Sequence, residues 1–167
     1  MDRDELRALQ APLKAEYREN PDAAVVTLKA DGELGSEAVS CSVQTGRALV
    51  DAGLHPASGG DGTLACSGDM LLQALVACAG VTLRSVATSL ETPITGGRVI
   101  AEGDLDFRGT MAVDRETPVG FRAIRLRFEL DSPATQEDLA TLLSLTERYC
   151  VVFQTIANGV PVTLDAA

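Results

Sequence analysis

The residues of this 167-residue chain with the most distinctive chemistry are its four cysteines, and Cys78 stands out among them. Cys78 lies within a stretch almost free of charge, beside the small residues Ala77, Ala79 and Gly80, which would let another element approach its sulfur closely. A cysteine thiolate is a nucleophile, and a second thiol can capture its sulfenic acid as a disulfide. A lone cysteine on an apolar helix is more often a small buried hydrophobic residue, so both interpretations stay open.

Metal and hydrolase chemistry have little support in the sequence. No two cysteines have the CxxC spacing and His55 is the only histidine, so a zinc site would need scattered ligands. His55 lies in a Gly/Pro-rich loop without a GxSxG motif, which predicts a surface residue. We expect Cys41 to be a core residue and Cys66 to be an exposed bystander. We expect neither a metal nor another cofactor.

The charge of the chain argues against two classes of partner. The formal net charge is -10 and the sequence pI is about 4.5, so nucleic acids and anionic membranes would be repelled. No apolar run reaches the roughly 20 residues that span a bilayer. The N-terminus is charged from Asp2 onward and has no secretory segment. These features predict a protein of the reducing cytoplasm, without nucleic-acid or membrane partners.

A long predicted helix from Ser67 to Leu90 positions Cys78. No ionisable carboxylate or amine lies between Asp69 and Arg84, and Asp69 in the first turn is favoured by the helix dipole whatever its function. The large apolar residues point round the whole circumference, which is typical of a helix that other elements cover on every side. They are Leu71, Leu72, Leu75, Val76, Val81 and Leu83.

The N-terminal half of the chain reads as a helix followed by short strands. Pro12 is expected to kink or interrupt the helix, and Asp31-Gly32 is a hairpin turn signal between two strands. The Gly-, Pro- and Ser-rich segment before Ser67 is expected to be a loop. The predicted elements are a helix at Asp2–Tyr17, strands at Ala24–Ala30, Ala38–Gln44 and Arg47–Asp51, and the loop at Ala52–Ser67.

In the C-terminal half, apolar and charged residues alternate as they do in half-exposed antiparallel strands, and two predicted helices follow. Strict alternation of apolar and charged residues predicts the strands, and a Ser-Pro start and a Gly end bound the helices. The predicted elements are strands at Arg98–Arg108 and Arg122–Leu130, a helix at Gln136–Tyr149, a short helix after Cys150 that ends at Gly159, and a strand at Val160–Leu164. The N-terminal amides of the short helix would favour the thiolate form of Cys150.

Together these elements predict an α+β domain in which an antiparallel sheet wraps a long buried central helix. We expect residues 1–22 to be a helical extension and residues 23–167 to form a single domain. One sheet and one helix leave apolar surface uncovered, so a homodimer is expected.

Two motifs carry a resemblance to a known family. One is SGDMLLQALVACAGVTL around Cys78, and the other is ERYCVVFQTIANGVPV around Cys150. On these motifs the chain resembles the OsmC/Ohr family, the osmotically induced and organic-hydroperoxide-resistance proteins. The resemblance implies an OsmC-like fold, an intertwined dimer and a peroxiredoxin-type oxidoreductase of oxidative stress, whose substrate is an organic hydroperoxide.

The resemblance also implies roles for individual residues. Cys78 would attack the hydroperoxide, Cys150 would close a disulfide onto it, and a thiol reductant of unknown identity would restore both. Asp69 stands at the place of the family's glutamate. The family's activating arginine has no exact counterpart, and Arg47 is the nearest candidate, with Arg84 or Arg148 next.

Two other functions remain as alternatives. One is a non-catalytic OsmC-like dimer that binds an apolar small molecule. The other is a hotdog-fold thioesterase, in which a sheet also curls round a long helix with an acid near its start; the paired cysteines count against it.

Overall fold

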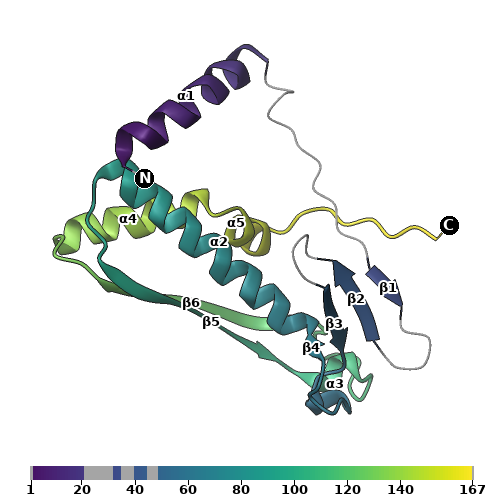
Figure 1. Ribbon diagram of the computed structural model, residues 1–167. Coiled ribbons are helices and arrows are strands. Elements are labelled where there is room, and N and C mark those ends of the chain that lie inside the picture. The colour runs from purple at the N-terminus through teal and green to yellow at the C-terminus, as the bar shows by residue number, and fades with distance from the viewer. Residues whose placement is uncertain (1, 21–31, 35–39, 45–48, 167) are drawn as a thin grey trace. The chain divides into compact units, whose positions relative to one another are not determined.

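The computed structural model describes residues 2–20, 32–34, 40–44 and 49–166 (Figure 1). The chain forms two compact units. The first unit contains Met1–Ala24, Ala74–Ile100 and Leu126–Ala167, and the second contains Val25–Gln73 and Ala101–Arg125. The expected division into an extension at residues 1–22 and one domain at residues 23–167 stays a prediction.

The predicted mixed α+β architecture is confirmed. The elements are α1 (Arg3–Glu19), β1 (Gly32–Leu34), β2 (Ser40–Gln44), β3 (Leu49–Gly53), the 3-10 helix η2 (Pro56–Ser58), β4 (Ala65–Cys66), α2 (Ser67–Leu90), β5 (Gly96–Leu105), α3 (Phe107–Thr110), β6 (Phe121–Asp131), α4 (Gln136–Tyr149) and α5 (Val151–Asn158).

The second unit contains a four-stranded sheet in the order β1-β2-β3-β4. The first two pairings are antiparallel and place Cys41 opposite Ala52, whereas β3 and β4 pair in parallel. The sheet is therefore mixed, and not wholly antiparallel as expected. Because β4 ends at Cys66, this sheet leads directly into the first turn of α2.

The first unit holds the hydrophobic core that positions Cys78. Leu75, Ala79, Leu83 and Ala87 of α2 are buried, and their spacing of four residues places them on one face of the helix. Leu83 and Ala87 pack against the fully buried Leu142 of α4. Side chains of β6 and of α4 close this core, and they are Phe128, Leu130, Leu139 and Leu143.

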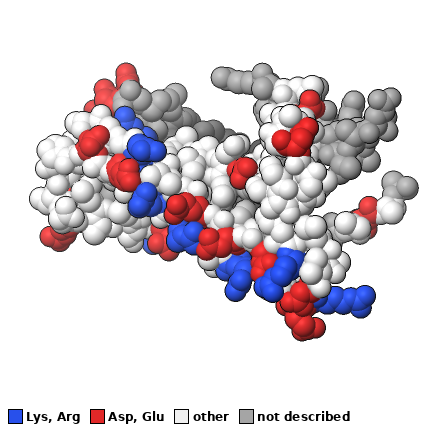
Figure 2. Space-filling view, turned by 90° about the horizontal axis from the view of Figure 1, so that it is seen from below, with Lys and Arg blue, Asp and Glu red and all other residues white. Residues whose placement is uncertain are grey.

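The outer side of the β5–β6 ribbon is charged, as the alternating sequence predicts. Arg125 pairs with Asp104 across the two strands, and Arg127 pairs with Glu129. Figure 2 shows groups of both signs alternating along this face. Such exposed pairs contribute little stability because water screens them, so their effect is to keep this face solvated.

Part of α2 is left uncovered by the described residues. Val81 is 72% exposed and Leu71 is 40% exposed, so the helix is covered on one stripe and not on every side. Among the described residues, α2 is the one helix whose length and mean hydropathy of 1.6 would allow it to cross a membrane. The core helix of a soluble protein has the same composition, so this property alone does not indicate a membrane protein.

Most predicted boundaries hold within a few residues, but three further details were wrong. Helix α1 continues through Pro12 without interruption, and Gly32 belongs to β1, where it pairs with Val43 instead of forming a turn. The predicted strand Val160–Leu164 is absent, because no described strand pairs with it and its side chains project into solvent. The predicted strand Ala24–Ala30 lies outside the described residues.

Candidate active site

The junction between α4 and α5 positions Cys150. Cys150 ends α4 by donating its amide to Thr146, and its own carbonyl accepts the amide of Gln154 in α5. The Gln154 side chain also donates to the carbonyl of Glu147, at 2.9 Å, which ties α5 to the last turn of α4. These bonds fix the direction of α5, and with it the direction of the backbone N–H groups in its first turn.

The backbone N–H groups at the start of α5 point at the sulfurs of Cys78 and Cys150. Burial raises the pKa of the Cys78 thiol, but the backbone amides of Val152 and Val151 and the side chains of Cys150 and Thr82 donate to its sulfur and bring the pKa below its ordinary value. Cys78 is partly exposed and Cys150 is 1% exposed. The start of α5 thus stabilises a thiolate on Cys78, in the manner of an anion at a helix N-terminus.

Cys150 has the opposite tendency. Burial raises the pKa of its thiol, and the neighbouring Cys78 raises it further, while the amides of Phe153 and Val152 offset only part of this effect. The amides at the start of α5 do favour a Cys150 thiolate, as expected, but burial and the Cys78 sulfur outweigh them. The two thiols therefore differ: Cys78 loses its proton more readily than an ordinary cysteine, and Cys150 less readily.

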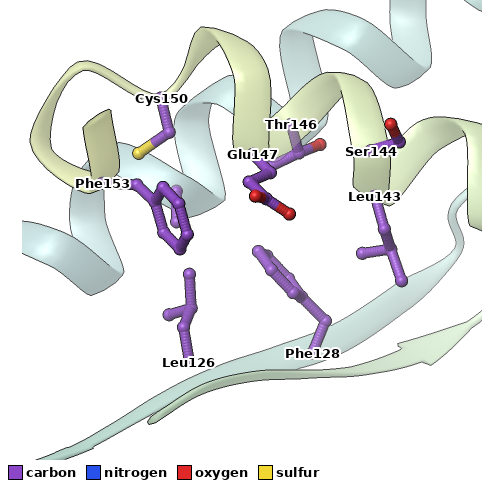
Figure 3. Close-up of a pocket in the computed structure, with 9 residues that line it drawn as sticks. Leu126, Phe128, Leu143, Ser144, Thr146, Glu147, Cys150 and Phe153 are labelled. Carbon is purple, nitrogen blue, oxygen red and sulfur yellow. The ribbon is translucent and has the colours of Figure 1, made fainter. Parts of the chain in front are cut away.

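A cavity of about 370 Å³ lies beside Cys150 (Figure 3). The view shows Leu126 and Phe128 rising from β6 toward Phe153 and Glu147, with the Cys150 sulfur turned toward Phe153. Apolar cavities of ~300–1,000 Å³ with a few polar groups are typical ligand sites. Cys150 lines this cavity, whereas Cys78 does not. The lining residues are Ala79, Leu126, Phe128, Leu143, Ser144, Thr146, Glu147, Cys150 and Phe153.

The structure brings only part of the predicted site together. Cys78 and Cys150 lie side by side, but Asp69 is exposed in the first turn of α2, in the part of the chain assigned to the other unit. Arg47 lies outside the described residues. The roles predicted for Asp69 and Arg47 therefore remain predictions.

The alternative arginines have other partners. Arg84 donates to the carbonyl of Ile94 at 2.7 Å, and Arg148 stacks over the Tyr149 ring. Cys66 is partly buried, so it is less open than expected, and His55 stacks on Phe107. Among the described residues, no three His, Cys, Asp or Glu side chains gather in a group that could hold a metal ion.

Sequence reasoning missed the groups that stabilise the thiolate. Thr82 lies one helical turn after Cys78, so the i, i+4 spacing could have identified it. The role of the Val151 and Val152 amides could not be predicted from the identity of these residues, because every residue except proline has a backbone N–H.

Comparison with known proteins then identifies the family. A sequence model described as OsmC-like protein matches residues 60–165, which include both cysteines of the pair. The chain belongs to the OsmC-like protein family. A search of curated proteins gives no significant match.

Solved structures share the fold of this OsmC-like protein at low sequence identity. An OsmC-like protein of Mycoplasma pneumoniae is 16% identical, with a TM-score of 0.67 over 80% of this chain and 89% of that one. An organic hydroperoxide resistance protein OsmC of Legionella pneumophila is 18% identical, with a TM-score of 0.62 over 79% of this chain and 90% of that one. An organic hydroperoxide resistance protein of Elizabethkingia anophelis is 16% identical, with a TM-score of 0.56 over 80% of this chain and 91% of that one.

The hydroxyl of Thr82 gives a direct test of the Cys78 thiolate. The rate of alkylation of Cys78 should reach half its maximum at a pH below the ~8.5 of a free cysteine, because only the thiolate reacts. Thr82→Val removes one donor to this sulfur, so the midpoint should move to higher pH. Thr88→Val is the matched control, since its hydroxyl donates to Arg84 on the same helix. An unchanged midpoint in Thr82→Val would show that the hydroxyl does not act on the sulfur.

Proposed function

We propose that this OsmC-like protein is a cytoplasmic thiol-dependent peroxidase that reduces organic hydroperoxides through Cys78 and Cys150. The observation that carries the proposal is the sulfur pair itself, in which the pKa of Cys78 is lowered and that of Cys150 is raised. The names of the Legionella pneumophila and Elizabethkingia anophelis proteins, which share the fold, support organic hydroperoxides as the substrate class.

The reaction follows from the different tendencies of the two thiols to ionise. The Cys78 thiolate attacks the terminal oxygen of the hydroperoxide, the O–O bond breaks, and the alkoxide leaves as an alcohol after protonation. Cys78 is then a sulfenic acid. The Cys150 sulfur attacks the Cys78 sulfur, a disulfide forms, and the sulfenic hydroxyl leaves as water. An external thiol reductant, whose identity is open, returns both cysteines to thiols.

The surroundings of Cys78 favour an apolar substrate. Ala74 and Val81 share its side of α2, and Val81 is 72% exposed. An alkyl or aryl group can lie on this surface, between the two copies of the dimer proposed below, while its peroxide group reaches the sulfur. Hydrogen peroxide has no such group, so it gains nothing from these contacts.

Peptide mapping tests the proposed reaction. After one equivalent of cumene hydroperoxide, the non-reduced digest should contain a peptide pair linked between Cys78 and Cys150, because the two sulfurs already lie together. Cys66 should remain a free thiol in the same digest. Finding Cys78 and Cys150 both as free thiols would reject the peroxidase.

A binding function is the second candidate, and the cavity beside Cys150 favours it. Four of its lining side chains, Leu126, Phe128, Leu143 and Phe153, are large and apolar. If the cysteines do not react with the hydroperoxide, a protein that holds an apolar small molecule in this cavity is the better account.

We further propose that the protein is a homodimer. Val162 is 87% exposed and Leu164 is 95% exposed, in a C-terminal segment without a partner strand among the described residues. Together with the exposed side of α2, these residues leave large apolar side chains in water, where a partner chain often covers such surface. A second copy can cover both features.

Sedimentation at micromolar concentration should therefore give the mass of two chains. Val81→Asp should weaken the dimer by at least about tenfold, since burying an unpaired carboxylate costs more than ~1.4 kcal/mol. Val113→Asp is the matched control, because Val113 is 70% exposed but lies in the β5–β6 connection. A folded wild-type monomer would contradict the dimer.

A further inference from the structure

We propose that the regenerating thiol enters the cavity beside Cys150 and attacks the Cys150 sulfur, so that the mixed disulfide of the catalytic cycle forms on Cys150. This inference rests on the proposed function, because it requires a disulfide between Cys78 and Cys150. It assigns the two sulfurs to two different approaches: the hydroperoxide meets Cys78 at the open side of α2, and the reductant meets Cys150 from the cavity.

The geometry of the cavity supports this separation. Cys150 is 1% exposed, and it lines the cavity of about 370 Å³. Figure 3 shows the sulfur facing Phe153, with Leu126 below. Since Cys78 does not line this cavity, a molecule held there contacts only one of the two sulfurs.

The cavity is large enough for a small thiol. An apolar protein cavity of ~150 Å³ can hold benzene, so one of more than twice that size has room for a thiol with a body of several carbon atoms. The hydroxyl of Ser144 and the carboxylate of Glu147 stand among apolar walls. They give the cavity a polar side that can accept a hydrogen bond from the incoming thiol.

The chemistry favours the same sulfur. Disulfide exchange is faster when the leaving thiol has the lower pKa. Attack on Cys150 expels Cys78, whose thiolate the amides of Val151 and Val152 stabilise. Attack on Cys78 would expel the Cys150 thiolate, which burial disfavours.

The step balances without a further oxidant. The reductant thiolate forms a bond to the Cys150 sulfur, the bond between the two protein sulfurs breaks, and its electron pair remains on Cys78 as a thiolate. A second reductant thiol then attacks the reductant's own sulfur in the mixed disulfide. The reductant leaves as its disulfide, and Cys150 takes up a proton as a thiol.

Trapping the mixed disulfide tests the assignment in the wild-type protein. The oxidised protein is mixed briefly with 2-mercaptoethanol, quenched with excess N-ethylmaleimide and mapped without reduction. The expected product carries mercaptoethanol on Cys150 and maleimide on Cys78. Mercaptoethanol on Cys78 with maleimide on Cys150 would overturn the inference.

The test distinguishes this inference from the proposed function. If cumene hydroperoxide forms no disulfide, the peroxidase is wrong, and the disulfide is then made with diamide and mapped in the same way. If the hydroperoxide forms the disulfide but mercaptoethanol appears on Cys78, the peroxidase stands and only the route of the reductant is wrong.

A cavity-filling variant gives an independent measurement. Leu126→Phe should slow the reduction of the disulfide by about tenfold, within the range that misplacing a reacting group by about 1 Å can cost. Its oxidation by cumene hydroperoxide should stay unchanged. Leu130→Phe is the matched control, because Leu130 lies on the same strand but lines a different cavity. Equal slowing of oxidation and reduction in Leu126→Phe would contradict separate approaches.

Discussion

Cys78→Ser is expected to abolish the consumption of tert-butyl hydroperoxide. The serine hydroxyl is not ionised near neutral pH, so the groups that stabilise the Cys78 thiolate have no anion to act on. The rate should fall by at least about a thousandfold, because removing the nucleophile of an enzyme costs this much or more. The measurement is the loss of hydroperoxide over time, with a thiol reductant in excess.

Cys66→Ser is the control for this experiment. Cys66 is a free and partly buried thiol at the end of β4, and the proposed reaction gives it no role. Its variant should keep the wild-type rate. Consumption that persists in Cys78→Ser and disappears in Cys66→Ser would move the nucleophile to Cys66 and reject the assignment of Cys78.

The helices next to the site could be predicted from the sequence because local signals define their ends. Thr135 caps α4 by accepting the amide of Asp138, and Gly159 follows the last residue of α5 with a positive φ. The bounds Gln136–Tyr149 were predicted from the Ser-Pro start of the helix, although the Thr135 cap was not identified, and Cys150 was placed correctly between the two helices.

The surroundings of α2 could not be predicted in the same way. An apolar circumference shows that a helix avoids water, but it does not show what covers each side. Ala79 is fully buried and Val81 is largely exposed, although both are apolar and lie two residues apart. The difference comes from the tertiary positions of α4 and β6, which the local sequence of α2 does not contain.

The strand predicted at Val160–Leu164 failed for a related reason. Its alternating valines fit a strand, but a strand needs a neighbour to accept and donate its backbone hydrogen bonds. No described strand of the same chain offers one. The proposed second copy would supply such a partner, so this failure and the open face of α2 lead to the same experiment on oligomeric state.

The contact between Cys78 and Cys150 could not be predicted from residue types and spacing alone. Their separation along the chain gives no physical reason for contact, and the resemblance of two motifs supplied the pair. The structure places them together and shows why their thiols differ, which the motifs did not. The electrostatic difference depends on the direction of α5, and that direction depends on the hydrogen bonds of Gln154 and Thr146.

Cys150→Ser should change the fate of Cys78 and not its first reaction. The Cys78 thiolate keeps the amides of Val151 and Val152, so it should still react with the first equivalent of cumene hydroperoxide. Without the Cys150 thiol no disulfide can form, and Cys78 should remain a sulfenic acid that dimedone traps. Sustained turnover should fall by at least about tenfold, and excess hydroperoxide should oxidise Cys78 irreversibly to the sulfinic and sulfonic acids.

Intact mass after stepwise addition of hydroperoxide measures this outcome. Wild type should lose two hydrogens as its disulfide forms, whereas Cys150→Ser should gain one oxygen and then more. Cys66→Ser should behave as wild type, because Cys66 lies outside the sulfur pair. If Cys150→Ser still forms an intramolecular disulfide at Cys78, another cysteine resolves the sulfenic acid. Cys150 would then be only a hydrogen-bond donor to the Cys78 thiolate.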